Sequence, residues 1–189
     1  MNNTNNEEYV TRLKKAYSTL SQATNQIIFE EGTPKATVGG WATSVEEIYK
    51  HYKKHLLNAR DCGTSSGCFG QGIIKTLKGT NDADYDNYTT SPKLVLADGT
   101  QVMFFASDYF SQSCEATYAG LATHVCANIY VDVNGRRKPN TYGRDVFVFA
   151  LKENGLHPIG CETSIDNCNK SSIGNGCACK VLREGAMNY

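Results

Sequence analysis

The N-terminal part of the chain carries one apolar stripe with the period of an α-helix. The residues of the stripe follow one another at alternating intervals of four and three: Tyr9, Leu13, Ala16, Leu20, Ala23 and Ile27. Tyr17 and Ile28 widen the stripe. Gly32 and Pro34 supply a stop signal after Glu31. The pattern predicts a helix from about Asn5 to Glu31, on the order of 40 Å long at roughly 1.5 Å per residue. Such a helix must bury its stripe, so the rest of the chain has to supply the surface that covers it.

The following segments predict a second helix and then a β-rich region. Ser44 and Glu47 have the spacing of a capping box, and the apolar face behind them consists of Val45, Ile48, Tyr49, Tyr52 and Leu56. Strands are predicted at 93–97, 101–105, 125–133, 145–151 and 156–159. Because Asp98-Gly99 and Asn154-Gly155 leave room only for tight turns, the strands that they join must be antiparallel. The predicted fold class is α+β, with the N-terminal helix packed on an antiparallel sheet.

The cysteine content indicates the cellular compartment of the protein. Eight of the 189 residues are cysteines: Cys62, Cys68, Cys114, Cys126, Cys161, Cys168, Cys177 and Cys179. An even and high number of cysteines is typical of disulfide-bonded proteins outside the cytoplasm. The sequence contains neither a secretory signal nor an apolar run long enough to span a membrane. We therefore expect that the segment directing export lies upstream of Met1.

The disulfide connectivity stays open at the level of sequence, since eight cysteines permit roughly 100 complete pairings. Small residues fill the loop 61–68, which suits a local bridge between its two cysteines. We expect four bridges: Cys62–Cys68, Cys114–Cys126, Cys161–Cys179 and Cys168–Cys177. The stretch from Gly160 is otherwise loop-rich and ends in a predicted short helix at 179–183. These bridges would hold irregular segments that contain too few apolar residues to pack on their own.

Charge and motif content argue against nucleic-acid binding and against catalysis. Nineteen basic residues balance nineteen acidic ones, and the basic run at 136–138 has no interleaved aromatic residues. The chain shows no Ser/His/Asp signature, no glycine-rich phosphate loop and no paired-carboxylate motif. His51 and His55 lie one helical turn apart but lack a zinc-binding pattern, so we expect solvated side chains there. No enzyme activity and no nucleic-acid partner are expected.

The segment 132–145 has the oxygen-rich composition of a calcium loop. Asp132, Asn134 and Asp145 are the candidate ligands, because calcium prefers carboxylate and amide oxygens. The spacing differs from that of an EF-hand, and the three cations at 136–138 oppose the assignment. The alternative is an ordinary turn built by Asn-Gly and Pro-Asn. Both interpretations stay open, and no other cofactor is expected.

Several motifs resemble those of one known family. The motifs are YVTRLKKAYS, VDVNG, PN, GRDVF and GCACK, at 9–18, 131–135, 139–140, 143–147 and 176–180. In this order, over nearly the whole chain, they resemble bacterial prepilin-type proteins, which include type IV pilins and the pseudopilins of type II secretion. Several pseudopilins bind calcium near their C-terminal strands, in agreement with the candidate ligands above.

The resemblance implies a domain organisation and a set of partners. Residues 1–31 would be the C-terminal half of the pilin spine helix, and 32–189 the globular head, with 160–189 as its Cys-rich C-terminal region. A membrane-spanning half-helix, processed and methylated at its N-terminus, would precede Met1 and anchor the protein in the periplasm or at the cell surface. The partners would be other pilin or pseudopilin subunits and the inner-membrane assembly machinery.

The expected function is that of a structural subunit, a minor pilin or pseudopilin, in a type IV pilus or type II secretion filament. Such subunits assemble by helix packing and need no bond chemistry. The alternative is a secreted, disulfide-rich adhesive or ligand-binding module. An apolar segment upstream of Met1 would distinguish the subunit from the module.

Overall fold

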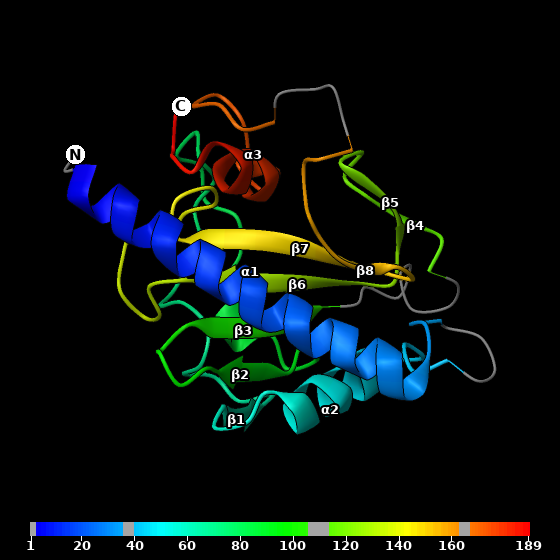
Figure 1. The fold of residues 1–189 in the computed structure, drawn as a ribbon. Coiled ribbons are helices and arrows are strands. Elements are labelled where there is room, and N and C mark those ends of the chain that lie inside the picture. Colours follow the sequence, from blue (N-terminus) through cyan, green and yellow to red (C-terminus); the bar gives the residue numbers. More distant parts are fainter. Residues whose placement is uncertain (1–2, 36–39, 106–113, 163–166) are drawn as a thin grey trace.

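A long helix crosses one face of an antiparallel sheet (Figure 1). The structure is a computed structural model that describes residues 3–35, 40–105, 114–162 and 167–189. Its helices are α1 (Asn3–Glu31), α2 (Val45–His55), the 3-10 helix η1 (Tyr85–Asn87) and α3 (Cys177–Glu184). Its strands are β1 (Arg60–Gly63), β2 (Lys93–Val95), β3 (Gln101–Phe105), β4 (Ala116–Tyr118), β5 (Ala122–Val125), β6 (Ala127–Asp132), β7 (Val146–Lys152) and β8 (Gly155–Pro158). The predicted combination of an N-terminal helix with an antiparallel sheet is therefore confirmed.

The buried face of α1 is the stripe seen in the sequence. Leu13, Leu20 and Ile27 are fully buried, and each contributes on the order of 2 kcal/mol by leaving water. Tyr17 stacks on Phe149 of β7, with ring centroids 5.3 Å apart. The helix ends where Gly32, with a φ of 84°, takes a left-handed conformation that a residue without a side chain adopts easily.

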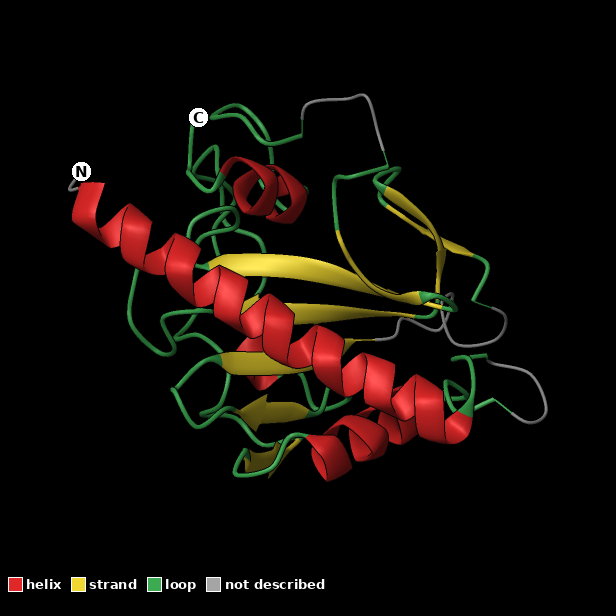
Figure 2. Cartoon of the chain, viewed as in Figure 1, coloured by secondary structure: helices red, strands yellow, loops and turns green. Residues whose placement is uncertain are grey.

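The second helix begins at the predicted cap. The Ser44 side chain accepts a hydrogen bond from the Glu47 backbone N–H at 3.1 Å. The Glu47 carboxylate does not turn back to complete the box but pairs with Lys50 at 2.7 Å. The apolar face of α2 packs on β3, where the ring of Tyr52 lies 5.1 Å from that of Phe104. This helix therefore covers the β2–β3 side of the sheet, next to α1 (Figure 2).

The main sheet has six strands in the order β1-β2-β3-β6-β7-β8, with antiparallel neighbours throughout. Both faces of β6 and β7 are covered, so these strands are buried along their whole length. Side chains alternate between the faces: Ile129 and Val131 belong to the core under α1, whereas Tyr130 and Val148 belong to a second core. The long β1–β2 connection contributes to that second core through Phe69, Ile74 and Tyr85.

One strand prediction and one helix prediction need correction, and strand β1 was not predicted. The predicted strand 125–133 is interrupted at Cys126, because Val125 ends β5 in a separate two-stranded sheet with β4. The C-terminal helix begins at Cys177, two residues earlier than expected. Strand β1 has no alternating apolar pattern, and only its pairing with β2 makes it a strand.

The four disulfides have the expected partners: Cys62–Cys68, Cys114–Cys126, Cys161–Cys179 and Cys168–Cys177. Two of them tie α3 to the segment that follows β8. Four disulfides indicate a protein that matures in an oxidising environment outside the cytoplasm. Within the described residues, no helix combines the length and the hydropathy needed to cross a membrane.

Candidate metal centre

Two aspartates and two asparagines meet in the connection between β6 and β7. Asp132 is the last residue of β6 and Asp145 directly precedes β7, so the sheet itself places the two carboxylates side by side. Asn134 and Asn140 lie in the loop between them. All four side chains are buried, with exposed fractions of 0, 0, 5 and 2% in the order Asp132, Asp145, Asn134, Asn140. The structure thus brings together all three predicted calcium ligands and adds Asn140.

Hydrogen bonds from the backbone fold the loop around the carboxylates. One oxygen of Asp145 accepts from the N–H of Asn140 at 2.8 Å, and the other accepts from the N–H of Thr141 at 2.7 Å. The Oδ1 of Asp132 accepts from the N–H of Asn134 at 3.1 Å. These bonds fix the loop, and they leave further acceptor capacity on both carboxylates.

Three buried oxygens at this site have no hydrogen-bond partner among the described residues: Asp132 Oδ2, Asn134 Oδ1 and Asn140 Oδ1. The amide orientations are constrained, because each NH₂ group donates to a carbonyl. Asn134 Nδ2 donates to Lys138 O at 3.2 Å, and Asn140 Nδ2 donates to Gln71 O at 2.7 Å. Since an unpaired buried polar group costs about 1–3 kcal/mol, these three oxygens around two carboxylates are groups that a bound cation or ordered water would satisfy.

Electrostatics at the site favour a cation. Burial raises the pKa of Asp132 well above its ordinary value, and the neighbouring Asp145 carboxylate raises it further. Burial also raises the pKa of Asp145. Among the described residues, no lysine or arginine lies within ion-pair distance of either carboxylate. The charge of Arg137 offsets that of Asp132 only in part, and a divalent cation would neutralise both carboxylates.

A second loop forms the outer wall of the site. The N–H of Gly70 donates to the Gln101 side chain at 2.7 Å, and Gln71 carries the carbonyl that binds Asn140. A Cβ built on Gly70 would lie 3.2 Å from Ile74 and 3.8 Å from Asp132 Oδ2. With a φ of 61° as well, this position suits glycine and lets the backbone approach the carboxylate closely.

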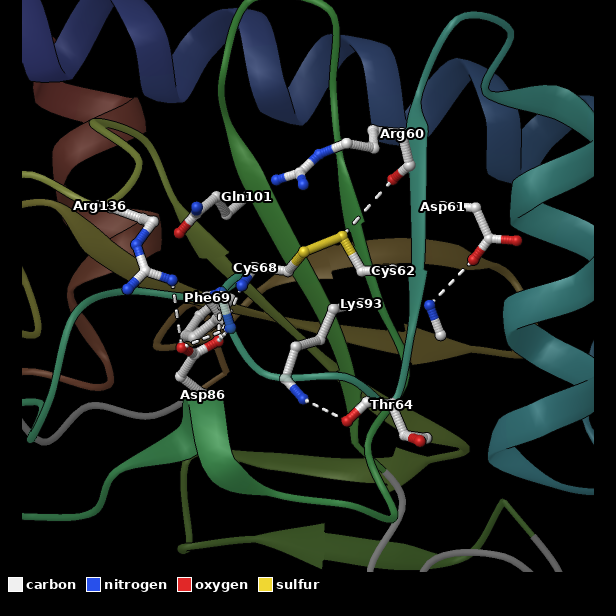
Figure 3. The surroundings of a disulfide bond; sticks show 12 residues. Arg60, Asp61, Cys62, Thr64, Cys68, Phe69, Asp86, Lys93, Gln101 and Arg136 are labelled. Carbon is white, nitrogen blue, oxygen red and sulfur yellow. Dashed lines mark hydrogen bonds and ion pairs between the residues drawn. A yellow bond between two sulfur atoms is a disulfide. The ribbon is translucent and has the colours of Figure 1, made fainter.

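Asp86 and the Cys62–Cys68 disulfide hold this wall in place (Figure 3). The buried Asp86 carboxylate accepts from the N–H groups of three consecutive residues, 67–69, at 2.8–2.9 Å. Arg136 completes the arrangement with an ion pair to Asp86 at 3.3 Å. The wall is therefore fixed by one covalent and several charge-assisted bonds, which preorganises the site behind it.

The three cations that opposed calcium in the sequence are directed elsewhere. Arg136 binds Asp86, and Arg137 pairs with Glu8 of α1 at 3.6 Å. The side chain of Lys138 is exposed and lines a separate surface groove. Neither Arg136 nor Arg137 forms an ion pair with Asp132 or Asp145, although Arg137 also donates to the carbonyl of Asn134 and its charge partly offsets the raised pKa of Asp132. The objection raised by their position in the sequence is therefore weaker than expected.

The site is also connected to α1. Asn134 Nδ2 donates to the hydroxyl of Tyr9 at 3.2 Å, and Arg12 donates to the carbonyl of Val133 at 3.4 Å. Tyr9 therefore has a polar role at the edge of the stripe, in addition to the apolar one expected from the sequence. The rest of the expected face is buried: Leu13, Ala16, Leu20, Ala23 and Ile27.

The donor set fits a hard cation such as calcium or magnesium. It consists of two carboxylates and two amide oxygens, without thiolate or imidazole. Zinc is disfavoured, because the described residues contain no group of three or more His, Cys, Asp or Glu side chains that could hold a metal. The prediction that His51 and His55 on α2 are both solvated needs correction. The His55 side chain is only 5% exposed, and its Nε2 lies 3.4 Å from the Glu30 carboxylate.

Sequence reasoning missed Asn140 and the wall formed by Gly70 and Gln71. Pro139-Asn140 has the composition of a turn, and Asn140 does take a positive φ of 51°. The wall residue Gln71 lies 69 positions before Asn140 in the chain, so only the fold reveals their contact. The one available signal was that Asn140 lies within the segment 132–145, which is already rich in Asp and Asn.

Comparison with known proteins identifies a family but no activity. No curated protein and no solved structure matches the chain. A family model described as a family of unknown function (DUF6613) matches residues 1–165, which include α1, the whole sheet and every candidate metal ligand. The chain therefore belongs to this family, DUF6613.

Proposed function

We propose that this protein is the head of an exported filament subunit of the pilin type. The observation that carries the proposal is the geometry of α1, which buries one face on its own sheet and leaves the other open. Its N-terminal end reaches past the sheet edge (Figure 2), where a preceding helical segment would continue the same axis. The disulfides and the prepilin-like motifs support the same assignment.

The exposed face of α1 would lie against neighbouring subunits. It carries Phe29, which is 89% exposed, and Leu57 beyond the end of α2 is 81% exposed. Isolated exposed apolar residues are common, but aromatic and aliphatic side chains also anchor subunit contacts. Filaments form when identical subunits make head-to-tail contacts that do not close into a ring.

Deletion of the gene in its native host tests the filament proposal. We expect electron microscopy to show loss of surface filaments, or a secretion assay to show loss of export, and the intact gene should restore either function. A Phe29→Ala/Leu57→Ala variant should fold normally yet restore assembly less well than a Lys50→Ala/Lys53→Ala control on the exposed side of α2. A product found in the medium as a monomer, with filaments and secretion unchanged, would instead support the secreted binding module.

We further propose that the head binds one calcium ion at Asp132, Asn134, Asn140 and Asp145. The three partnerless buried oxygens carry this proposal, because calcium takes six to eight oxygen ligands and tolerates irregular geometry. Magnesium requires a nearly ideal octahedron and gives up its water reluctantly, so it should bind less well. The ion would bridge the β6–β7 connection and thereby hold the loop that contacts α1 through Tyr9.

Isothermal titration of the chelator-treated protein tests the calcium proposal. We expect one calcium ion per chain, weaker binding of magnesium, and loss of binding in an Asp145→Asn variant. A Glu153→Gln variant, which removes one exposed carboxylate, should bind as the unaltered protein does. Equal heats for the two variants, or no heat with calcium at all, would refute a cation site here.

A further inference from the structure

A basic groove lies at the end of the head where α1 begins. It has a volume of about 660 Å³ and extends between the start of α1, the β6–β7 connection and the C-terminal segment. Asn6 lines it from α1, and Tyr189 lines it from the other end of the chain. The two termini lie near each other at this end of the molecule (Figure 1).

Three exposed lysines line the groove without partners. Lys75, Lys138 and Lys170 make no ion pair with any described residue, and the described residues that line the groove include no aspartate or glutamate. Arg144 adds a fourth cationic side chain. Elsewhere on the surface, Lys15, Lys50, Lys53 and Lys54 are each paired with a carboxylate. In a chain whose net charge is zero, this groove is a local concentration of positive charge.

The groove is amphiphilic rather than purely polar. Leu77, Pro139 and Met187 give it an apolar part, and Thr76 and Thr141 add hydroxyl groups. The Tyr189 hydroxyl donates to the carbonyl of Gly143, which ties the C-terminal segment to the β6–β7 connection. Cations beside apolar surface suit a negatively charged group attached to an apolar body.

We propose that this groove binds the phosphate headgroups of anionic membrane lipids. The proposal rests on the proposed function, because an anchoring helix before α1 would hold this end of the head against the membrane surface. Lysines near an anionic bilayer are each worth roughly a fivefold gain in membrane partitioning. Nucleic acid fits less well, since a zero net charge and a single short groove do not follow a line of phosphates.

Vesicle sedimentation with the 189-residue chain tests the proposal. Vesicles of phosphatidylcholine, with or without about 30% phosphatidylglycerol, are compared at roughly 0.1 M and 0.5 M NaCl without divalent cations. We expect binding only to the anionic vesicles and only at low salt. The Lys75→Gln/Lys138→Gln/Lys170→Gln variant should partition roughly a hundredfold more weakly. The Lys50→Gln/Lys53→Gln/Lys54→Gln control loses the same charge from α2, away from the groove, and should bind almost normally.

Other outcomes would overturn the lipid assignment. Equal losses in both triple variants would mean that overall charge, and not the groove, determines vesicle binding. Full competition by millimolar inorganic phosphate would indicate a site for a free anion, and tighter binding to a DNA duplex than to vesicles would indicate a nucleic-acid surface. Because this assay requires no filament assembly, its failure is distinguishable from failure of the filament proposal.

Discussion

Replacement of Leu20 by aspartate is expected to lower the melting temperature of the head by about 10–20 °C. Leu20 is fully buried in the core between α1 and the sheet. The change removes its packing and leaves an unpaired carboxylate in an apolar environment, which together cost roughly 5 kcal/mol or more. For a chain of this size, each kcal/mol lowers the melting temperature by about 2–4 °C. Leu13, equally buried, should respond in the same way.

Ser18→Asp is the matched control, because Ser18 lies on the exposed side of the same helix. Both variants are compared by circular dichroism with the disulfides intact, and the control should melt within a few degrees of the unaltered protein. A Leu20→Asp protein that melted normally, while filament assembly failed, would show that this face contacts another subunit rather than the chain's own sheet.

Calcium is expected to stabilise the head, and Asp132→Asn to abolish that effect. A ligand at about 100 times its Kd adds roughly 2.7 kcal/mol of stability, which corresponds to a rise of about 5–10 °C in melting temperature. Without calcium the variant should be as stable as the unaltered protein or more so, because one of two adjacent buried carboxylates is gone. Glu153→Gln should leave the calcium-induced rise unchanged. A rise of equal size in Asp132→Asn would contradict the proposed ligand set.

The same carboxylates predict an unusual pH dependence. Because burial raises the pKa of Asp132 and Asp145, the calcium-free folded protein binds more protons than the unfolded chain above about pH 4. The contribution of these groups is therefore largest at low pH and is lost as the pH rises through their raised pKa values. Melting at about pH 4.5 and about pH 7.5, with and without calcium, should show the greatest stabilisation by calcium at the higher pH. A calcium-induced stabilisation that increased toward acid pH would contradict this prediction.

Local sequence determined much of this protein. The stripe from Tyr9 to Ile27 predicted α1, because apolar residues with a period of 3.6 residues indicate an amphipathic helix. The glycine and the proline that follow predicted where the helix ends. Asp98-Gly99 and Asn154-Gly155 predicted the β2–β3 and β7–β8 hairpins, since such short connections permit only antiparallel pairing. The expected disulfide partners are those found in the structure, although the sequence alone left many other pairings open.

Tertiary structure decided what depends on contacts between distant residues. Strand β1 exists only through its pairing with β2, and the predicted strand at 125–133 is divided because Val125 pairs with β4. At the metal centre the sequence supplied Asp132, Asn134 and Asp145, whereas the fold added Asn140 and the wall at Gly70. Only the fold shows that Arg136 and Arg137 form ion pairs with Asp86 and Glu8 rather than with the carboxylates of the site. Helical periodicity and turn signals arise from residues that are close in the sequence, so they can be predicted from it. The orientation of a side chain and its burial away from water depend on contacts across the whole folded chain.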